Sequence, residues 1–319
     1  MKTDFIHNYD FDPTYGYGLQ ELLKVSSPNE PRKYKNFWKQ LYQETVDFPV
    51  DFSIEYLEER EKCQVYFLDY QSTHGVRIRG WLTTPKDRAV EKALIISHGY
   101  GGRHEPDFHL PFEDSALFFP CSRGLGRSHH YPISPEPKWH VRHNIHDRRE
   151  YIIGHCVQDL WVAVSIAEKL FPQVRGRVGL MGISFGGGIG VMASAWDSRI
   201  KKAHFNIPTF GNQTLRLELP SFGSAKSLQD LHKREPRMVE KTLAYFDAAT
   251  SAKYIQIPVH FACALFDPYV APPGQFAIYN ALTENKELFV LSAGHFDYDD
   301  KEKEQRQLLL ELKDFFKDL

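Results

Sequence analysis

Residues 178 to 191 read VGLMGISFGGGIGV, and this stretch decides the fold that the sequence predicts. The apolar run at its start predicts a buried strand, and the small residues after it predict a closely packed helix. Between them, Ser184 stands in the pattern Gly-x-Ser-x-Gly, in which Gly182 and Gly186 allow the chain to turn sharply around the serine. This arrangement is typical of a serine nucleophile, although a glycine-rich turn with an incidental serine would show the same pattern.

The segments on either side of this stretch predict alternating strands and helices. Apolar runs predict further strands at residues 93–97, 116–120, 200–207, 259–265 and 287–292, and an antiparallel pair at residues 64–70 and 76–83 with a turn near His74. Apolar spacing and composition predict helices at residues 34–44, 150–171, 187–195, 235–246, 272–282 and 301–319. We therefore expect an α/β fold with a mostly parallel central sheet covered by helices on both faces.

Two stretches depart from this alternation. Residues 1–60 are rich in aromatic and charged side chains and predict an N-terminal extension packed on the core, which would occupy residues 61–319. Residues 208–257 separate two predicted strands and contain polar loops and helix-like stretches. Because insertions of this size in an α/β fold are usually functional, we expect a helical cap over the site.

Composition restricts the classes of partner. The chain has 39 basic and 41 acidic residues, so it offers no broad basic surface for nucleic acid or an anionic membrane. The first residues lack the apolar core of a signal peptide, and no apolar stretch is long enough to span a membrane. The four cysteines are irregularly spaced, which favours free thiols over disulfides or a zinc site. We expect a cytoplasmic protein that acts on a small molecule.

A catalytic serine needs a histidine that accepts its proton and a carboxylate that orients this histidine. Asp267 and His295 each follow a predicted strand, and the chain order Ser184, Asp267, His295 is that of α/β-hydrolases. Because the carboxyl ends of parallel strands meet at one edge of the sheet, we expect these side chains to lie together. Either residue alone could be an ordinary loop residue, whereas their joint order and placement favour catalysis.

Other candidates fit less well. Asp197 follows the predicted turn too soon to be the acid, and His260 lies inside a predicted strand, which favours a core position. His140, His143 and His146 recur at every third residue, but their segment is charged and rich in proline and contains no H-E-x-x-H pattern. We therefore expect neither a metal nor another cofactor.

Acyl transfer also needs backbone donors that stabilise the oxyanion of the tetrahedral intermediate. The sequence His98-Gly99-Tyr100-Gly101-Gly102 directly follows the predicted strand that ends at Ser97, where α/β-hydrolases place the first donor. We expect the backbone N–H groups of Tyr100 and Phe185 to form the oxyanion hole. A glycine turn without catalytic function is the alternative.

These motifs resemble those of the acetyl xylan esterase and cephalosporin C deacetylase family of α/β-hydrolases over nearly the full chain. The resembling stretches are His98-Gly99-Tyr100, Arg123-Gly124-Leu125-Gly126, the segment Gly182 to Gly187, Leu243 to Asp247, Pro272-Pro273 and Phe276 to Asn280. The resemblance implies that Ser184, Asp267 and His295 form the triad, and that the protein removes acetyl groups from small carbohydrates such as xylo-oligosaccharides. It also implies an intracellular homo-oligomer, often a hexamer in this family.

Several positions depart from the family pattern. Leu125 and Phe185 replace glutamines of two family motifs, Phe296 stands where a glutamate usually follows the histidine, and Cys121-Ser122 replaces a common Asp-Val pair. At Leu125, Phe185 and Phe296, an apolar side chain replaces a polar one near the expected site. The resemblance therefore leaves the substrate and the acyl length open.

Together, these observations predict a serine carboxylesterase that hydrolyses short-chain, in particular acetyl, esters of a carbohydrate through an acyl-enzyme. Two alternatives remain: a peptidase or amidase of the same fold, and a non-catalytic binding protein with an α/β-hydrolase-like fold. A dehalogenase or epoxide hydrolase is disfavoured, because those enzymes carry aspartate where this chain has Ser184.

Overall fold

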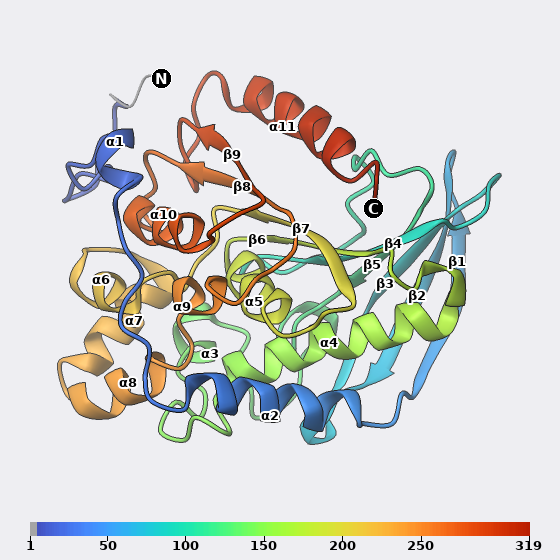
Figure 1. Ribbon diagram of the computed structural model, residues 1–319, viewed down its shortest axis with the longest axis horizontal. Coiled ribbons are helices and arrows are strands. Elements are labelled where there is room, and N and C mark those ends of the chain that lie inside the picture. Colours follow the sequence, from blue (N-terminus) through green and yellow to red (C-terminus); the bar gives the residue numbers. More distant parts are fainter. Residues whose placement is uncertain (1–4) are drawn as a thin grey trace.

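A nine-stranded sheet runs through the centre of the computed structural model, which describes residues 5–319 (Figure 1). Its strands are β1 (Phe52–Glu59), β2 (Cys63–Gln71), β3 (Arg77–Pro85), β4 (Lys92–Ser97), β5 (Ser115–Pro120), β6 (Val178–Ile183), β7 (Ile200–Asn206), β8 (Val259–Ala264) and β9 (Lys286–Leu291). They lie in the order β1-β2-β3-β5-β4-β6-β7-β8-β9. The first three strands and the β3–β5 pair are antiparallel, and the other neighbours are parallel. The predicted α/β-hydrolase fold is confirmed.

Helices cover both faces of this sheet. They are α1 (Leu19–Leu22), α2 (Tyr34–Val46), α3 (Pro137–His140), α4 (Ile152–Leu170), α5 (Phe185–Ser194), α6 (Gln213–Glu218), α7 (Gly223–His232), α8 (Pro236–Leu243), α9 (Ala248–Ala252), α10 (Pro272–Ala281) and α11 (Lys301–Phe315). Figure 1 shows α11 on one face of the sheet and α2, α4 and α5 on the other. None of the helices within residues 5–319 combines the length and apolar character that crossing a membrane requires.

Burial explains the character of the central elements. All six residues of β4 and of β8 are buried, as a parallel strand covered on both faces requires. Nearly all residues of helix α4 are buried, because the helix packs between the sheet and α2. The ring centroids of Trp38 in α2 and Trp161 in α4 lie 6.2 Å apart, and both side chains are fully buried.

The strand β1 was missed by the sequence prediction, which began the sheet near residue 64. It pairs with β2 at the edge of the sheet, where most of its side chains remain exposed, including those of Ile54, Tyr56 and Leu57. Phe52, Ile54 and Tyr56 alternate with polar residues, which is a strand signal, but the prediction placed these residues in the N-terminal extension.

The segment between β7 and β8 contains α6 to α9, and the side chain of Asp247 fixes its base. This fully buried carboxylate accepts hydrogen bonds from the backbone N–H of Gln213 at 2.6 Å and of Thr250 at 2.7 Å. It therefore caps α9 and also holds the start of α6. The predicted cap, residues 208–257, includes both contacts, and its function as a cap stays a prediction.

Candidate active site

Ser184 lies on the turn between β6 and α5, so the predicted strand, turn and helix are confirmed. Its φ of 55° and ψ of −115° place it in a region that residues other than glycine rarely adopt. Three hydrogen bonds hold this conformation: Ser184 N–H donates to the Asn206 carbonyl at 2.9 Å, and the Ser184 carbonyl accepts from Gly188 at 3.0 Å and Thr209 at 3.1 Å. The strained turn is thus fixed by β7 and by the segment after it.

The two glycines of the motif are required by close backbone contacts. A Cβ atom on Gly182 would lie 2.3 Å from the carbonyl oxygen of Gly186, and one on Gly186 would lie 2.6 Å from the carbonyl oxygen of His98. Both distances are far below van der Waals contact. Gly182 is therefore required by the tightness of the turn itself, and Gly186 by the packing of the turn against the end of β4.

The side chains of Ser184, His295 and Asp267 form one chain of hydrogen bonds. His295 Nε2 lies 3.0 Å from Ser184 Oγ, and His295 Nδ1 lies 2.8 Å from Asp267 Oδ2. Because a carboxylate only accepts, Nδ1–H donates to Asp267, which leaves Nε2 to accept from the serine hydroxyl. The structure thus brings together three residues that follow β6, β8 and β9, in the geometry of a nucleophile, a base and its orienting acid.

Asp267 is fully buried and surrounded by donors. Its Oδ1 accepts from the backbone N–H of Tyr269 and of Val270, each at 2.9 Å, and its Oδ2 also accepts from Gln275 Nε2 at 3.2 Å. The sequence interpretation missed Gln275, whose Oε1 in turn accepts from Ala264 N–H at 2.8 Å. A signal was present, because a buried glutamine in the otherwise apolar start of α10 needs hydrogen-bond partners.

Glu304 in α11 holds both ends of the loop that carries His295. Its carboxylate accepts from Ser292 N–H at 3.0 Å and Ser292 Oγ at 2.5 Å on one side, and from Tyr298 Oη at 2.6 Å on the other. His295 has a positive φ of 45°, which is costly for a residue other than glycine. Glu304 therefore helps to maintain a strained loop conformation, although it lies outside every motif of the sequence.

Replacing Glu304 with alanine should lower kcat for 4-nitrophenyl acetate by about 10- to 100-fold, because small displacements of a catalytic group are expensive. Steady-state kinetics of Glu304→Ala measures this loss. Glu302→Ala, an exposed position on the same helix, serves as the control and should keep wild-type kcat. Wild-type kcat in Glu304→Ala would show that the loop holds its conformation without the carboxylate.

The pKa of His295 lies above its ordinary value of 6.5. Burial of the ring lowers the pKa, but the negative charge of Asp267 and its hydrogen bond to the ring raise it by more. A histidine with a raised pKa is protonated, and therefore unable to accept the serine proton, up to a higher pH than usual.

We expect kcat/KM for 4-nitrophenyl acetate to fall as the pH is lowered through an apparent pKa above 6.5. In Asp267→Asn this inflexion should move to lower pH. The substitution removes the negative charge that raises the pKa of His295, while the burial that lowers this pKa remains. A pH–rate profile of both proteins measures the shift. An inflexion that stays in place, or moves upward, would contradict the assigned pairing.

The backbone N–H groups of Tyr100 and Phe185 flank the serine. Phe185 is the first residue of α5, and Tyr100 follows Gly99, where an added Cβ would lie 3.5 Å from Ser184 Cβ. Among the described residues 5–319, neither N–H donates to a protein acceptor. Both groups are therefore available to a ligand oxygen, and their function as an oxyanion hole stays a prediction.

His98 fixes the loop that carries Tyr100. Its Nε2 accepts from Ser122 N–H at 3.0 Å, so its Nδ1–H donates to the Gly99 carbonyl at 2.6 Å. Burial lowers the pKa of His98 to about 4, so the ring is neutral at physiological pH. The histidine of this motif thus holds the loop in place and does not face the serine.

Aromatic packing replaces the polar groups that the family resemblance would place beside the serine. The fully buried ring of Phe185 stacks on Tyr100, with centroids 4.3 Å apart, and contacts Phe210 edge to face. Tyr100 Oη donates to His140 Nδ1 at 3.3 Å, and His140 Nε2 donates to the carbonyl of Arg123 at 3.0 Å. Phe185 therefore supports the loop of Tyr100 by packing.

Arg123, from the motif Arg123-Gly124-Leu125-Gly126, is fully buried and connects three segments of the fold. Its guanidinium donates twice to the Asp159 carboxylate, at 2.9 and 2.5 Å, and also reaches the hydroxyl groups of Ser72 and Thr73. It thereby ties the loop after β5 to α4 and to the β2–β3 turn. Leu125 of the same motif packs in the hydrophobic core.

A cleft of about 610 Å³ opens over the serine. Three segments form its walls: the loop of residues 99–102, the start of α7 and the loop that carries His295. The aromatic side chains that line it are Tyr100, Phe222, Tyr269, Phe296 and Tyr298. A cleft of this size, with apolar walls and few polar groups, suits a small organic ligand.

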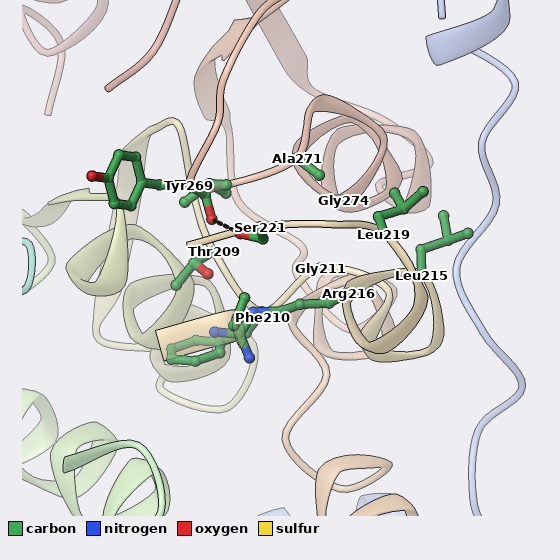
Figure 2. Close-up of a pocket in the computed structure, with 12 residues that line it drawn as sticks. Thr209, Phe210, Gly211, Leu215, Arg216, Leu219, Ser221, Tyr269, Ala271 and Gly274 are labelled. Atoms are coloured by element: carbon green, nitrogen blue, oxygen red, sulfur yellow. Dashed lines mark hydrogen bonds between the residues drawn. The ribbon is translucent and has the colours of Figure 1, made fainter. Parts of the chain in front are cut away.

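A smaller pocket of about 20 Å³ lies beside the cleft and shares Thr209, Tyr269 and Val270 with it (Figure 2). Figure 2 shows Arg216 extending toward the ring of Phe210; its guanidinium carbon lies 5.1 Å from the ring centroid. Ser221 Oγ donates to the Tyr269 carbonyl at 3.0 Å, the dashed line in the figure. With room for about one water molecule, this pocket connects the segment after β7 to the loop of Asp267 and is too small for a substrate.

One group of three side chains within residues 5–319 has the composition of a metal site: His74, Glu150 and His155. Their ligand atoms lie within 4.8 Å of one another, but the two imidazole rings stack with centroids 3.7 Å apart and planes 24° apart. A metal ion lies in the plane of each imidazole that binds it, so rings this close to parallel do not converge on one ion. None of the three lines the cleft.

Comparison with known proteins agrees with this architecture. The family model for acetyl xylan esterase (AXE1) matches residues 16–313. The acetyl esterase Axe7A of Xylanibacter ruminicola is 22% identical over 295 residues; the match covers 85% of this chain and 64% of that protein, so the chain spans less than two thirds of this relative.

Two solved structures have the same fold. The acetyl xylan esterase of Paenibacillus sp. R4 superposes with a TM-score of 0.82 at 22% identity, covering 92% of this chain and 99% of that one. Acetyl xylan esterase 1 of Thermoanaerobacterium sp. JW/SL YS485 gives a TM-score of 0.79 at 22% identity, covering 95% and 99%. Since the family model spans most of the sequence, the chain belongs to the acetyl xylan esterase family, a family of carboxylic ester hydrolases.

Proposed function

We propose that this protein is a serine carboxylesterase that hydrolyses short-chain esters, in particular acetyl esters of a carbohydrate. The observation that carries the proposal is the unbroken hydrogen-bond chain from Asp267 through His295 to Ser184, in which Ser184 and His295 line the cleft. Membership of the acetyl xylan esterase family supports a carbohydrate ester as substrate.

In the proposed reaction, Ser184 Oγ attacks the ester carbonyl carbon while its proton moves to His295 Nε2. The buried carboxylate of Asp267 stabilises the imidazolium, and the N–H groups of Tyr100 and Phe185 stabilise the oxyanion. The imidazolium then protonates the leaving alcohol, which leaves an acyl-serine. Water attacks this ester, gives its proton to His295 and releases the carboxylic acid, and the serine is restored.

A rate profile tests the proposed substrate class. We would measure kcat/KM on 4-nitrophenyl esters of increasing acyl length, beside acetate release from acetylated xylo-oligosaccharides, with peptide anilides as the comparison for an amidase. The proposal expects the acetyl esters to be hydrolysed fastest and the anilides not to be cleaved. Faster cleavage of anilides, or of long acyl chains, would overturn it.

Three further expectations from the sequence stay predictions: a cytoplasmic location, a homo-oligomeric state, and deacetylation of cephalosporin C in the manner that the family resemblance implies. Each needs a separate measurement, and none is required by the proposed mechanism.

A further inference from the structure

Residues 5–11, which we call the aromatic segment, form no regular helix or strand and carry a ring at every second position. Phe5, His7, Tyr9 and Phe11 are half-buried, whereas the residues between them are exposed. This alternation places four rings on one face, as in a strand that packs on its neighbour by one side. The aromatic segment precedes residue 16, where the match to the acetyl xylan esterase family model begins. It therefore lies outside the residues that the family model matches.

The rings of the aromatic segment contact two walls of the cleft. Tyr9 lies 5.6 Å from Phe222, at the start of α7, and 6.3 Å from Phe296, the residue after His295, as measured between ring centroids. Phe11 also packs on Phe222 at 5.4 Å, and Phe5 on Phe296 at 5.4 Å. Phe222 and Phe296 both line the cleft. The segment therefore bridges the α7 wall and the histidine wall.

The aromatic contacts continue toward the reacting groups. Phe222 packs on Tyr269 at 5.6 Å, and Tyr269 on the ring of His295 at 5.7 Å. The chain just after the segment is anchored as well, because the Pro13 carbonyl accepts from Asp267 N–H at 3.1 Å. Aromatic contacts thus run from the aromatic segment to His295, the group that would protonate the leaving alcohol in the proposed reaction.

The chemistry of this surface suits a sugar ring. A pyranoside presents apolar C–H groups on its faces and hydroxyl groups at its edge, so it combines stacking on aromatic rings with hydrogen bonds to nearby polar groups. Ser224, Lys301 and Gln305 line the same cleft and can supply such hydrogen bonds. A purely apolar or aryl alcohol would leave these polar groups unused.

We propose that the aromatic segment completes a binding wall made by Phe222, Tyr269 and Phe296, and that this wall binds the pyranoside ring of the leaving alcohol. Tyr9 is a positioning residue in this arrangement, because it holds Phe222 and Phe296 in one surface. The inference rests on the proposed esterase function and adds the site that selects the alcohol.

The test compares substrate selectivity in wild type, Tyr9→Ala and Tyr9→Phe. Acetate release gives kcat/KM for an acetylated methyl xylopyranoside and for ethyl acetate, and the ratio of the two is the readout. Tyr9→Ala should lower this ratio about three- to tenfold, the size of one aromatic contact, through a higher KM for the sugar ester. Tyr9→Phe keeps the ring and should retain the ratio. Tyr131→Ala, at a tyrosine that is 88% exposed, is the matched control and should also retain it.

An unchanged ratio in Tyr9→Ala would overturn the proposal, and so would an equal loss on both esters, which would indicate an effect through Asp267 alone. A greater loss for phenyl acetate than for the sugar ester would assign the wall to aryl groups instead. Calorimetry of xylobiose binding to Ser184→Ala, with and without Tyr9→Ala, measures the affinity of the binding wall for a sugar in the absence of hydrolysis. Absence of ester turnover in wild type would refute the esterase function, whereas absence of xylobiose binding would refute this inference.

Discussion

Replacing Ser184 with alanine is expected to lower kcat for 4-nitrophenyl acetate by about 10⁴-fold or more, the loss typical of a missing triad nucleophile. The geometry leads to this expectation, because Ser184 Oγ is the hydroxyl within hydrogen-bond distance of His295 Nε2 and it faces the cleft. The alanine side chain fits the same turn, so the fold should be unchanged. The residual rate would reflect the oxyanion donors and binding alone.

Ser198→Ala is the matched control for this variant. Ser198 is exposed and lies between α5 and β7, and the variant should retain wild-type kcat. Near wild-type turnover in Ser184→Ala would mean that another group attacks the ester, and the proposed mechanism would have to be abandoned.

The second large effect is expected for Asp267→Asn, at about 10³- to 10⁴-fold in kcat. Two backbone N–H groups point at Oδ1, so the amide oxygen of asparagine would occupy that place. The NH₂ group would then face His295 Nδ1, where Oδ2 now accepts. A donor at this position favours the tautomer with the proton on Nε2, which cannot accept a proton from Ser184.

Asp297→Asn controls for charge near the histidine. Asp297 lies two residues after His295 with a 94% exposed side chain, and its removal should leave kcat close to that of wild type. If Asp267→Asn and Asp297→Asn had equal, small effects, Asp267 would be a structural residue of the loop and not the orienting acid.

The strands and the residues at their ends could be predicted from the sequence, because patterns of neighbouring residues mark them. The apolar runs that predict β4, β6 and β8 are continuous, and the turn around Ser184 is marked by glycines that its backbone contacts require. The ends of parallel strands share one edge, so the order of Ser184, Asp267 and His295 was enough to predict that they lie together.

The partners of the side chains that support these residues could not be predicted in the same way, because a polar side chain on a helix does not indicate which group it will contact. Gln275 and Glu304 are ordinary polar residues on helices until the fold places them against Asp267 and the histidine loop. The contact of Pro13 with Asp267 spans most of the sequence. Such pairs leave no spacing pattern, and only the three-dimensional packing defines them.

The positions where the chain departs from the family pattern have a common physical explanation. Phe185 packs on Tyr100 and Phe210, and Phe296 packs on Phe266 with centroids 4.9 Å apart. Apolar contacts therefore support the donor loop and the histidine loop, while hydrogen bonds from Gln275 and Glu304 hold Asp267 and the histidine loop.

The central claim, that Ser184 forms an acyl-enzyme, is tested most directly by peptide-mapping mass spectrometry of protein quenched during turnover of 4-nitrophenyl acetate. The mechanism predicts an acetyl group on the peptide that contains Ser184 and none at this position in Ser184→Ala. Turnover without acetylation of Ser184, or acetyl transfer to another residue at the rate of turnover, would contradict it.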